Sequence, residues 1–182
     1  MPAERERALV ARAREEAAAF AELYDFYMPR VYGFVYRRVR DRCAAEDLTS
    51  VTFQRALENV RRSDFRNECF GGWLYRVASN AVVDHVRRDR RHVPIADLED
   101  EVPADLALDG LAAALDRDQL RRALKALPDN HREVIVLRFY DDLDGPEMCA
   151  VLGCSRETLA VRLHRALRAL RVAVARESAD VA

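Results

Sequence analysis

Apolar residues recur at three- and four-residue spacing along most of the chain, and no stretch alternates polar and apolar residues with a period of two. Such spacing places the apolar side chains on one face of an α-helix, whereas a half-buried strand needs strict alternation. The 182 residues include only six glycines and six prolines, too few for the many turns of a β-sandwich. The sequence therefore predicts an all-α protein.

Helical periodicity predicts three long helices in the first half of the chain, over residues 15–40, 44–60 and 73–91. The stretch 61–72 between the second and third of them is expected to be a loop, because it is polar and ends in two glycines. The apolar faces expected to be buried comprise Phe20, Leu23, Tyr27, Val31 and Phe34 in the first helix, Leu48, Phe53, Ala56, Leu57 and Val60 in the second, and Leu74, Val77, Ala78, Ala81 and Val82 in the third.

The composition changes abruptly after the third expected helix. The segment 93–118 carries eight acidic residues and a single arginine, and it contains two prolines. Strongly charged segments with few aromatic residues cannot bury enough apolar surface to fold, so we expect an acidic linker here. The chain is thus predicted to be two small helical domains joined by a flexible tether, with residues 1–92 as the first domain, 93–116 as the linker, 117–176 as the second domain and 177–182 as a tail.

Composition excludes several classes of protein. A net charge of −1 is incompatible with a generally basic, histone-like protein. The four cysteines form no CxxC pair and have no histidine at metal-ligand spacing, so we expect neither a metal nor another cofactor. No apolar run approaches the roughly 18 residues of a membrane-spanning helix, and the charged N-terminus has no apolar core of a secretion signal. We therefore expect a cytoplasmic protein without membrane insertion.

The second half of the chain contains the pattern of a helix-turn-helix. Asp144 and Glu147 have the spacing of a capping box, Gly153 fits the left-handed turn that ends a short helix, and Ser155 can cap the next one. That next helix carries six arginines and one acidic residue as far as Arg176, and its leucines 159, 163, 167 and 170 form the expected buried stripe. The second helix of such a motif enters the major groove of DNA, so we predict DNA binding here rather than an ordinary helical hairpin.

The helix expected over residues 73–91 carries a continuous polar face of a different kind. An amide, a carboxylate and several guanidinium groups on one face can read base edges while holding phosphates. Three aromatic residues lie in or beside the expected loop before it, where they could stack on unpaired bases at about 1–3 kcal/mol per base, or could equally be core residues. The polar face comprises Arg76, Asn80, Asp84, Arg87, Arg88 and Arg91, and the aromatic residues are Phe65, Phe70 and Trp73.

The helix expected over residues 44–60 presents an acidic and polar face that should repel DNA and suit a basic protein surface. One domain therefore offers separate faces to DNA and to a protein partner. The members of this acidic face are Glu46, Asp47, Ser50, Gln54 and Glu58.

Together these features resemble an RNA polymerase sigma factor of the sigma-70 family, in its extracytoplasmic-function (ECF, group 4) subfamily. Residues 23–27, 45–53, 73–80 and 84–88 look like region 2 of that family. The run 126–134 followed by the helix-turn-helix looks like region 4. The resemblance covers most of the chain, with two matched regions in the family's order.

The resemblance implies a dissociable subunit that binds bacterial core RNA polymerase at its clamp and flap and selects promoter DNA. Region 2 would hold the clamp through Glu46, Asp47, Ser50 and Gln54. It would read the minus-ten element through the polar face around Asn80 and Asp84, while the stretch 65–72 would capture a flipped base. An anti-sigma factor is a common further partner in this family. Region 4 would read the minus-35 element through Ser155, Arg156, Glu157, Thr158, Arg162 and Arg165.

Two other interpretations compete with this one. A polymerase-independent LuxR-type helix-turn-helix regulator would bind palindromic sites as a dimer, but it leaves the polar face of residues 73–91 without a role. A hydrolase or metal enzyme has little support, because the four histidines lie far apart in sequence and no nucleophile has a neighbouring base. We expect no catalytic residues, since bond formation would belong to the polymerase.

Overall fold

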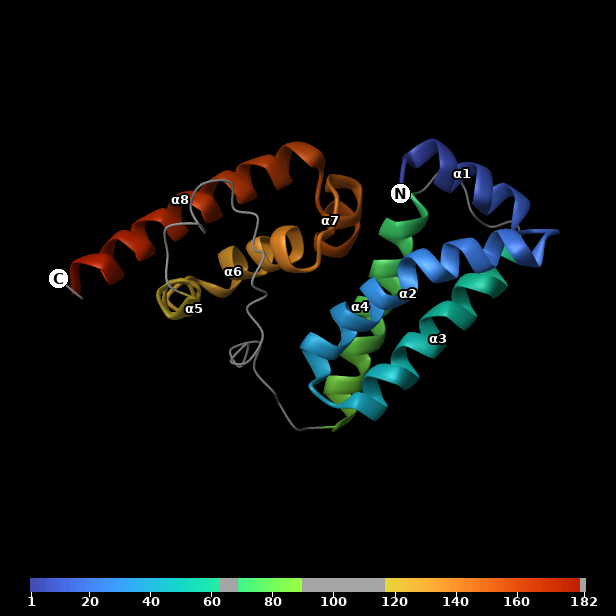
Figure 1. Ribbon diagram of the computed structural model, residues 1–182, viewed down its shortest axis with the longest axis horizontal. Helices are drawn as coiled ribbons and strands as arrows, with labels where there is room; N and C mark the ends of the chain where they lie inside the picture. Colours follow the sequence, from blue (N-terminus) through green and yellow to red (C-terminus); the bar gives the residue numbers. More distant parts are fainter. Residues whose placement is uncertain (63–68, 90–116, 181–182) are drawn as a thin grey trace. The chain divides into compact units, whose positions relative to one another are not determined.

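The computed structural model describes residues 1–62, 69–89 and 117–180, and all regular structure within them is helical (Figure 1). The predicted all-α fold is therefore confirmed. The chain divides into two compact units, one built from the N-terminal helices and the other mainly from the C-terminal ones, and each has its own core. The predicted acidic linker, 93–116, lies outside the described residues.

The described residues of the N-terminal unit form four helices, α1 to α4. Helices α2 and α3 lie side by side as a hairpin, α4 packs against both, and α1 lies on α2 and touches α4 (Figure 1). At the hairpin, Arg40 adopts a left-handed conformation and the side chain of Asp41 accepts a hydrogen bond from the Ala44 N–H at 2.7 Å, which starts α3. The helices span Ala3–Arg12 (α1), Ala17–Val39 (α2), Arg42–Arg61 (α3) and Phe70–Asp89 (α4).

The core of the N-terminal unit is aromatic and follows the predicted apolar faces closely. Phe34 of α2 meets Tyr75 of α4 edge-to-face at 5.3 Å, and Tyr27 of α2 meets Phe70 of α4 at 5.6 Å. Each such ring pair adds to the free energy gained from apolar burial. Of the predicted core residues in α2, only Phe20 remains half-buried; Leu23, Tyr27, Val31 and Phe34 are buried.

One helix of this unit was not predicted, and one predicted boundary was wrong. Helix α1 was not expected, because its sequence is mostly polar and its apolar face is short. Leu9 and the capping residue Ala13 are buried on that side. Helix α4 begins at Phe70, so the last three residues of the expected loop 61–72 are helical and buried. The reason for the early start is a carboxylate: Glu6 of α1 accepts hydrogen bonds from the first N–H groups of α4.

In the part of the C-terminal unit that the structure describes lie helices α5, α6, α7 and α8 and the π-helical stretch η2. Helices α5 and α6 pack against α8, the longest helix of the unit, and η2 continues α6 directly. Helix α8 continues past the predicted domain end at Arg176, so part of the predicted tail is helical. The elements span Arg117–Lys125 (α5), Asp129–Ile135 (α6), Val136–Tyr140 (η2), Gly145–Leu152 (α7) and Arg156–Asp180 (α8).

The buried stripe of α8 differs in part from the prediction. Leu159 and Leu170 are buried as expected, while Leu163 and Leu167 are only half-buried. Ala166 and Val174 take the remaining core positions, since they continue the i, i+4 row of Leu170 toward α5 and α6. Helices α5 and α6, which pack against α8, decide which of its residues are buried.

A buried arginine closes the turn between α5 and α6. Arg132 of α6 donates to three backbone carbonyl oxygens: its Nε to that of Leu124 at 3.0 Å, and a terminal nitrogen to those of Lys125 at 3.0 Å and Leu127 at 2.8 Å. The last carbonyl groups of a helix have no intrahelical partner and form the negative end of its dipole. Arg132 therefore caps the C-terminus of α5.

Candidate nucleic-acid and polymerase interfaces

The predicted polar face of α4 is present on the surface. Arg76, Asn80, Asp84, Arg87 and Arg88 are all exposed, at offsets of four, eight, eleven and twelve residues along one helix. The guanidinium of Arg88 donates to the backbone carbonyl oxygen of Asp84 at 3.1 Å, which holds it along the helix. The opposite residues Leu74, Ala78 and Ala81 are buried. Arg91, predicted on the same face, lies outside the described residues.

The aromatic residues at the start of α4 divide into two roles. Trp73 is half-buried in the first turn, next to the polar face. Phe70 is only 1% exposed and packs on Tyr27, so it has no ring face to offer to a base, and its predicted place in an exposed loop is wrong. The physical reason is that α4 starts at this residue and turns its ring into the core. Phe65 lies outside the described residues.

The acidic face of α3 is also exposed. It stands clear of the core because the buried residues of α3 lie on the other side of the helix. Glu46 pairs with Arg42 at 2.9 Å, and this partner raises the pKa of Arg42 through a hydrogen bond and charge attraction. Gln54 donates to Glu58 at 3.3 Å. The exposed members are Glu46, Asp47, Ser50, Gln54 and Glu58, as predicted.

The turn between α7 and α8 has the geometry predicted from its sequence. The Asp144 side chain accepts from the Glu147 N–H at 2.9 Å, and the Glu147 side chain accepts from the Asp144 N–H at 2.8 Å, a complete capping box. Gly153 ends α7 in the left-handed conformation, with φ at 59°. The Ser155 hydroxyl accepts from the Thr158 N–H at 3.3 Å and so caps α8.

Ser155 and the first three turns of α8 project the predicted DNA-reading side chains into solvent. The pKa of Glu157 is lowered, first by a hydrogen bond from Ser155, then by one from its own backbone N–H. An ionised Glu157 at a helix N-terminus can accept hydrogen bonds, while the arginines donate them. The exposed set comprises Ser155, Arg156, Glu157, Thr158, Arg162 and Arg165.

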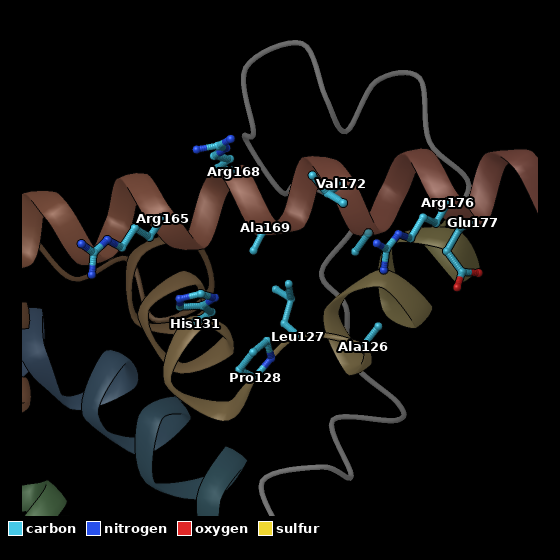
Figure 2. A pocket seen from close by; sticks show the side chains of 11 residues that line it. Ala126, Leu127, Pro128, His131, Arg165, Arg168, Ala169, Val172, Arg176 and Glu177 are labelled. Atoms are coloured by element: carbon cyan, nitrogen blue, oxygen red, sulfur yellow. The ribbon is translucent and has the colours of Figure 1, made fainter.

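The C-terminal unit also contains a groove that the sequence did not indicate. It has a volume of about 610 Å³ and lies between α8 and the turn from α5 to α6 (Figure 2). Leu127 reaches toward α8, where Val172 is 48% exposed, and Arg165 and Arg176 lie along the same helix (Figure 2). An exposed valine among arginines was the one available signal. Arg165 thus lies between the predicted DNA-reading face and this groove.

Within the described ranges there is no cluster of three or more His, Cys, Asp or Glu side chains that could hold a metal ion. None of the helices in those ranges is long and apolar enough to cross a membrane. Cys149 and Cys154, which lie around the turn between α7 and α8, are both partly buried. The pKa of the Cys149 thiol is raised, chiefly by burial and secondly by the nearby Cys154 thiol.

Two family models match the chain. The model of sigma-70 region 2 matches residues 23–92, and that of sigma-70 region 4 matches residues 117–170. The ECF RNA polymerase sigma factor SigW of Bacillus subtilis is 31% identical over 164 residues, which are 84% of this chain and 87% of SigW. The chain belongs to the ECF sigma factors of the sigma-70 family.

Two further comparisons agree with this membership. The ECF sigma factor BldN of Streptomyces coelicolor is 35% identical over 170 residues, and the match spans 89% of this chain but 63% of BldN. A solved structure of CnrH in complex with the cytosolic domain of CnrY superposes with a TM-score of 0.61 at 26% identity, covering 92% of this chain and 96% of CnrH. The interpretation as a LuxR-type regulator is not favoured, because the region 2 match accounts for the N-terminal unit.

Proposed function

We propose that this ECF sigma factor binds bacterial core RNA polymerase and directs promoter-specific initiation, with its N-terminal unit reading the minus-ten element and its C-terminal unit the minus-35 element. The observation that carries the proposal is the pairing of two exposed polar faces, on α4 and on the start of α8, each within its matched family region. Neither face has an enzymatic arrangement of side chains. Bond formation belongs to the polymerase.

The division of labour within the N-terminal unit follows from charge. The acidic face of α3 would be repelled by phosphates, whereas the arginines of α4 attract them. We assign α3 to the polymerase clamp through Glu46, Asp47, Ser50 and Gln54. We assign α4 to DNA through Trp73, Arg76, Asn80, Asp84, Arg87 and Arg88, with Phe65 and Arg91 as further candidates in sequence.

The C-terminal unit is assigned in the same way. The exposed start of α8 suits the major groove, because side chains near a helix N-terminus reach base edges while arginines hold phosphates. The groove between α8 and the α5–α6 turn suits a protein segment instead, since apolar side chains such as Leu127 and Val172 line it beside several arginines. We assign it to the polymerase flap. The place of action is then the bacterial cytoplasm, where the polymerase works.

An anti-sigma factor belongs to the proposal as a regulator. CnrH, which this chain resembles in fold and sequence, was solved with the cytosolic domain of CnrY. An inhibitor that covered the acidic face of α3 or the groove on α8 would compete with core polymerase. Promoter recognition is the primary function, and inhibition follows from sharing its surfaces.

Transcription from a promoter library by bacterial core polymerase, with and without this protein, tests the proposal. We expect initiation at a defined set of promoters only when the protein is present, and this set gives the promoter sequence. The double variant Asn80→Ala/Asp84→Ala should lower specific initiation by about tenfold or more, because each lost base contact costs about 1–3 kcal/mol.

The matched control is Arg55→Ala, an exposed residue of α3 outside the acidic set, which should leave initiation unchanged. In the C-terminal unit, Arg156→Ala and Arg162→Ala should each weaken binding to the minus-35 element. Loss of an arginine that contacts a phosphate should make the slope of log affinity against log salt concentration less steep by about 0.9. Tight binding to a palindrome without polymerase, and no stimulation of transcription, would refute the proposal.

A further inference from the structure

A buried carboxylate ties three helices of the N-terminal unit together. Glu6 of α1 is 5% exposed, and its Oε1 accepts a hydrogen bond from the Phe70 N–H at 2.9 Å. Its Oε2 accepts one from the Gly71 N–H at 3.4 Å and one from the hydroxyl of Tyr27. Both oxygens of one side chain are thus used by α2 and by the first turn of α4.

This contact performs the task of a helix N-cap, but from a distant part of the chain. The first N–H groups of a helix have no intrahelical partner and form the positive end of its dipole, so a carboxylate there is favourable. A usual cap is the residue directly before the helix. Here the cap comes from 64 residues earlier, in a helix that precedes the region 2 match at residues 23–92.

The capped turn is the part of α4 that leads into the proposed minus-ten surface. Trp73 lies in the same first turn, and its backbone N–H donates a hydrogen bond to the carbonyl oxygen of Cys69 at 3.0 Å. Arg76 and Asn80 follow on the next two turns of the same rigid helix. The position of the first turn therefore sets the direction in which Trp73 and the polar face point.

We propose that Glu6 is a positioning residue for minus-ten recognition: by capping α4 from α1 and binding Tyr27, it holds the start of α4 in the orientation that presents Trp73 and the polar face to an unpaired base. The proposal rests on the proposed function. It also makes α1, which lies before the matched region, a working part of the promoter-reading unit.

The acidic face of α3 provides an internal control. The hydrogen bonds of Glu6 join α1 to α2 and α4, whereas Glu46 and Asp47 lie on the exposed side of α3. Loss of Glu6 should therefore weaken DNA capture while core binding persists. General unfolding of the unit would abolish both, so the split between the two affinities separates positioning from mere stability.

Three variants test this in the full-length protein. Glu6→Leu removes both acceptors of the α4 N–H groups, Glu6→Gln removes the charge and leaves one amide oxygen, and Tyr27→Phe removes only the hydroxyl that donates to Glu6. Glu22→Gln is the matched control, because Glu22 joins α2 to Arg5 of α1 at 3.1 Å on the surface, away from α4. The reporter is Trp73, the single tryptophan of the chain.

Two quantities are measured: the affinity of the protein for core polymerase, and the affinity of the resulting holoenzyme for a single-stranded oligonucleotide carrying the minus-ten sequence found in the library experiment. We expect Glu6→Leu to lose about tenfold in oligonucleotide affinity and to shift Trp73 emission, with core affinity within about twofold. Glu6→Gln and Tyr27→Phe should show smaller losses in that order. Glu22→Gln should match the wild type.

Equal losses of core and oligonucleotide affinity, or wild-type behaviour of both Glu6 variants, would overturn the proposal. If Glu6→Leu failed to fold, Glu6→Gln and Tyr27→Phe would decide by the same split. If the wild type bound neither core nor oligonucleotide, the proposed function would fail on its own. Independently of binding, an unchanged Trp73 emission in Glu6→Gln and Tyr27→Phe would refute the role of Glu6 in setting the start of α4.

Discussion

In each unit of this sigma factor a buried charged side chain from one helix caps the end of another, and the two side chains are placed by different means. Glu6 caps the N-terminus of α4 and Arg132 caps the C-terminus of α5, each with the sign that the helix dipole favours. The backbone carbonyl groups that Arg132 binds lie five to eight residues away in sequence. The groups that donate to Glu6 lie 21 to 65 residues away.

The difference shows how each of the two proposed promoter-reading surfaces is supported. The Arg132 cap forms within the short segment from α5 to α6, so it needs little more than local chain closure. The Glu6 cap forms only when α1, α2 and α4 have already packed, so it depends on the whole N-terminal unit. We infer that the start of α4 is more sensitive to distant substitutions than the turn between α5 and α6, which pack against α8.

The largest expected effect comes from the two cores. Phe34→Ala should lower the free energy of unfolding by about 3–5 kcal/mol and Leu170→Ala by about 2–5 kcal/mol, because both side chains are fully buried. Urea unfolding is followed by Trp73 fluorescence and by far-UV ellipticity. Phe34→Ala should shift the Trp73 transition, and Leu170→Ala should shift only the part seen by ellipticity. A Trp73 transition displaced equally by both would contradict the division into two cores.

Arg132→Met sharpens the comparison of the two caps. It leaves three carbonyl oxygens without their charged donor, so we expect a loss of about 3 kcal/mol in the C-terminal unit. The measurement is urea unfolding monitored by ellipticity. Arg138→Met is the control, since Arg138 is exposed and bonds to one carbonyl oxygen, that of Leu143 at 3.0 Å, and should cost about 1 kcal/mol. Equal costs would refute the capping role of Arg132.

The two caps of the helix-turn-helix should differ in a graded way. Asp144→Ala removes a reciprocal capping box and should cost about 1 kcal/mol, whereas Ser155→Ala removes one longer hydrogen bond of 3.3 Å and should cost about half as much. Thermal unfolding of the C-terminal unit measures both. A larger loss in Ser155→Ala would show that the turn depends on α8 more than on α7.

The smallest expected effect concerns acid stability in the two units. The pKa of Glu157 is lowered chiefly by a hydrogen bond from Ser155, and that of Glu16 chiefly by one from Arg12. A lowered folded-state pKa adds stability above the ordinary value of about 4.3, which is lost as pH falls through the folded-state pKa. Glu157→Gln and Glu16→Gln should each slightly flatten the fall of the melting temperature below about pH 5. A steeper fall in either variant would contradict the direction of the shift.

Sequence reasoning succeeded where the signal is local. The polar face from Arg76 to Arg88 follows from helical spacing alone, and so does the acidic face of α3. The capping box at Asp144 and the left-handed Gly153 require only the residues within one turn of them. Boundaries came within a few residues, since helix ends depend on capping groups that periodicity does not show.

It failed where a distant side chain decides. Phe70 was expected in an exposed loop but lies in the core. Its backbone N–H donates to the Glu6 carboxylate, and its ring packs on Tyr27. Helix α1 went unrecognised because its apolar face is short and its key residue is a glutamate. The groove beside Val172 depends on how α5 and α6 pack against α8, which no spacing rule contains.

The sequence by itself determined the helical class, the two matched regions and the residue types on each exposed face, because these follow from periodicity, capping chemistry and charge along the chain. The tertiary structure alone decided where α4 begins, which aromatic residues face the core, and that a groove lies beside α8. Those features arise from contacts between residues far apart in sequence, and their energies exist only after the helices have packed.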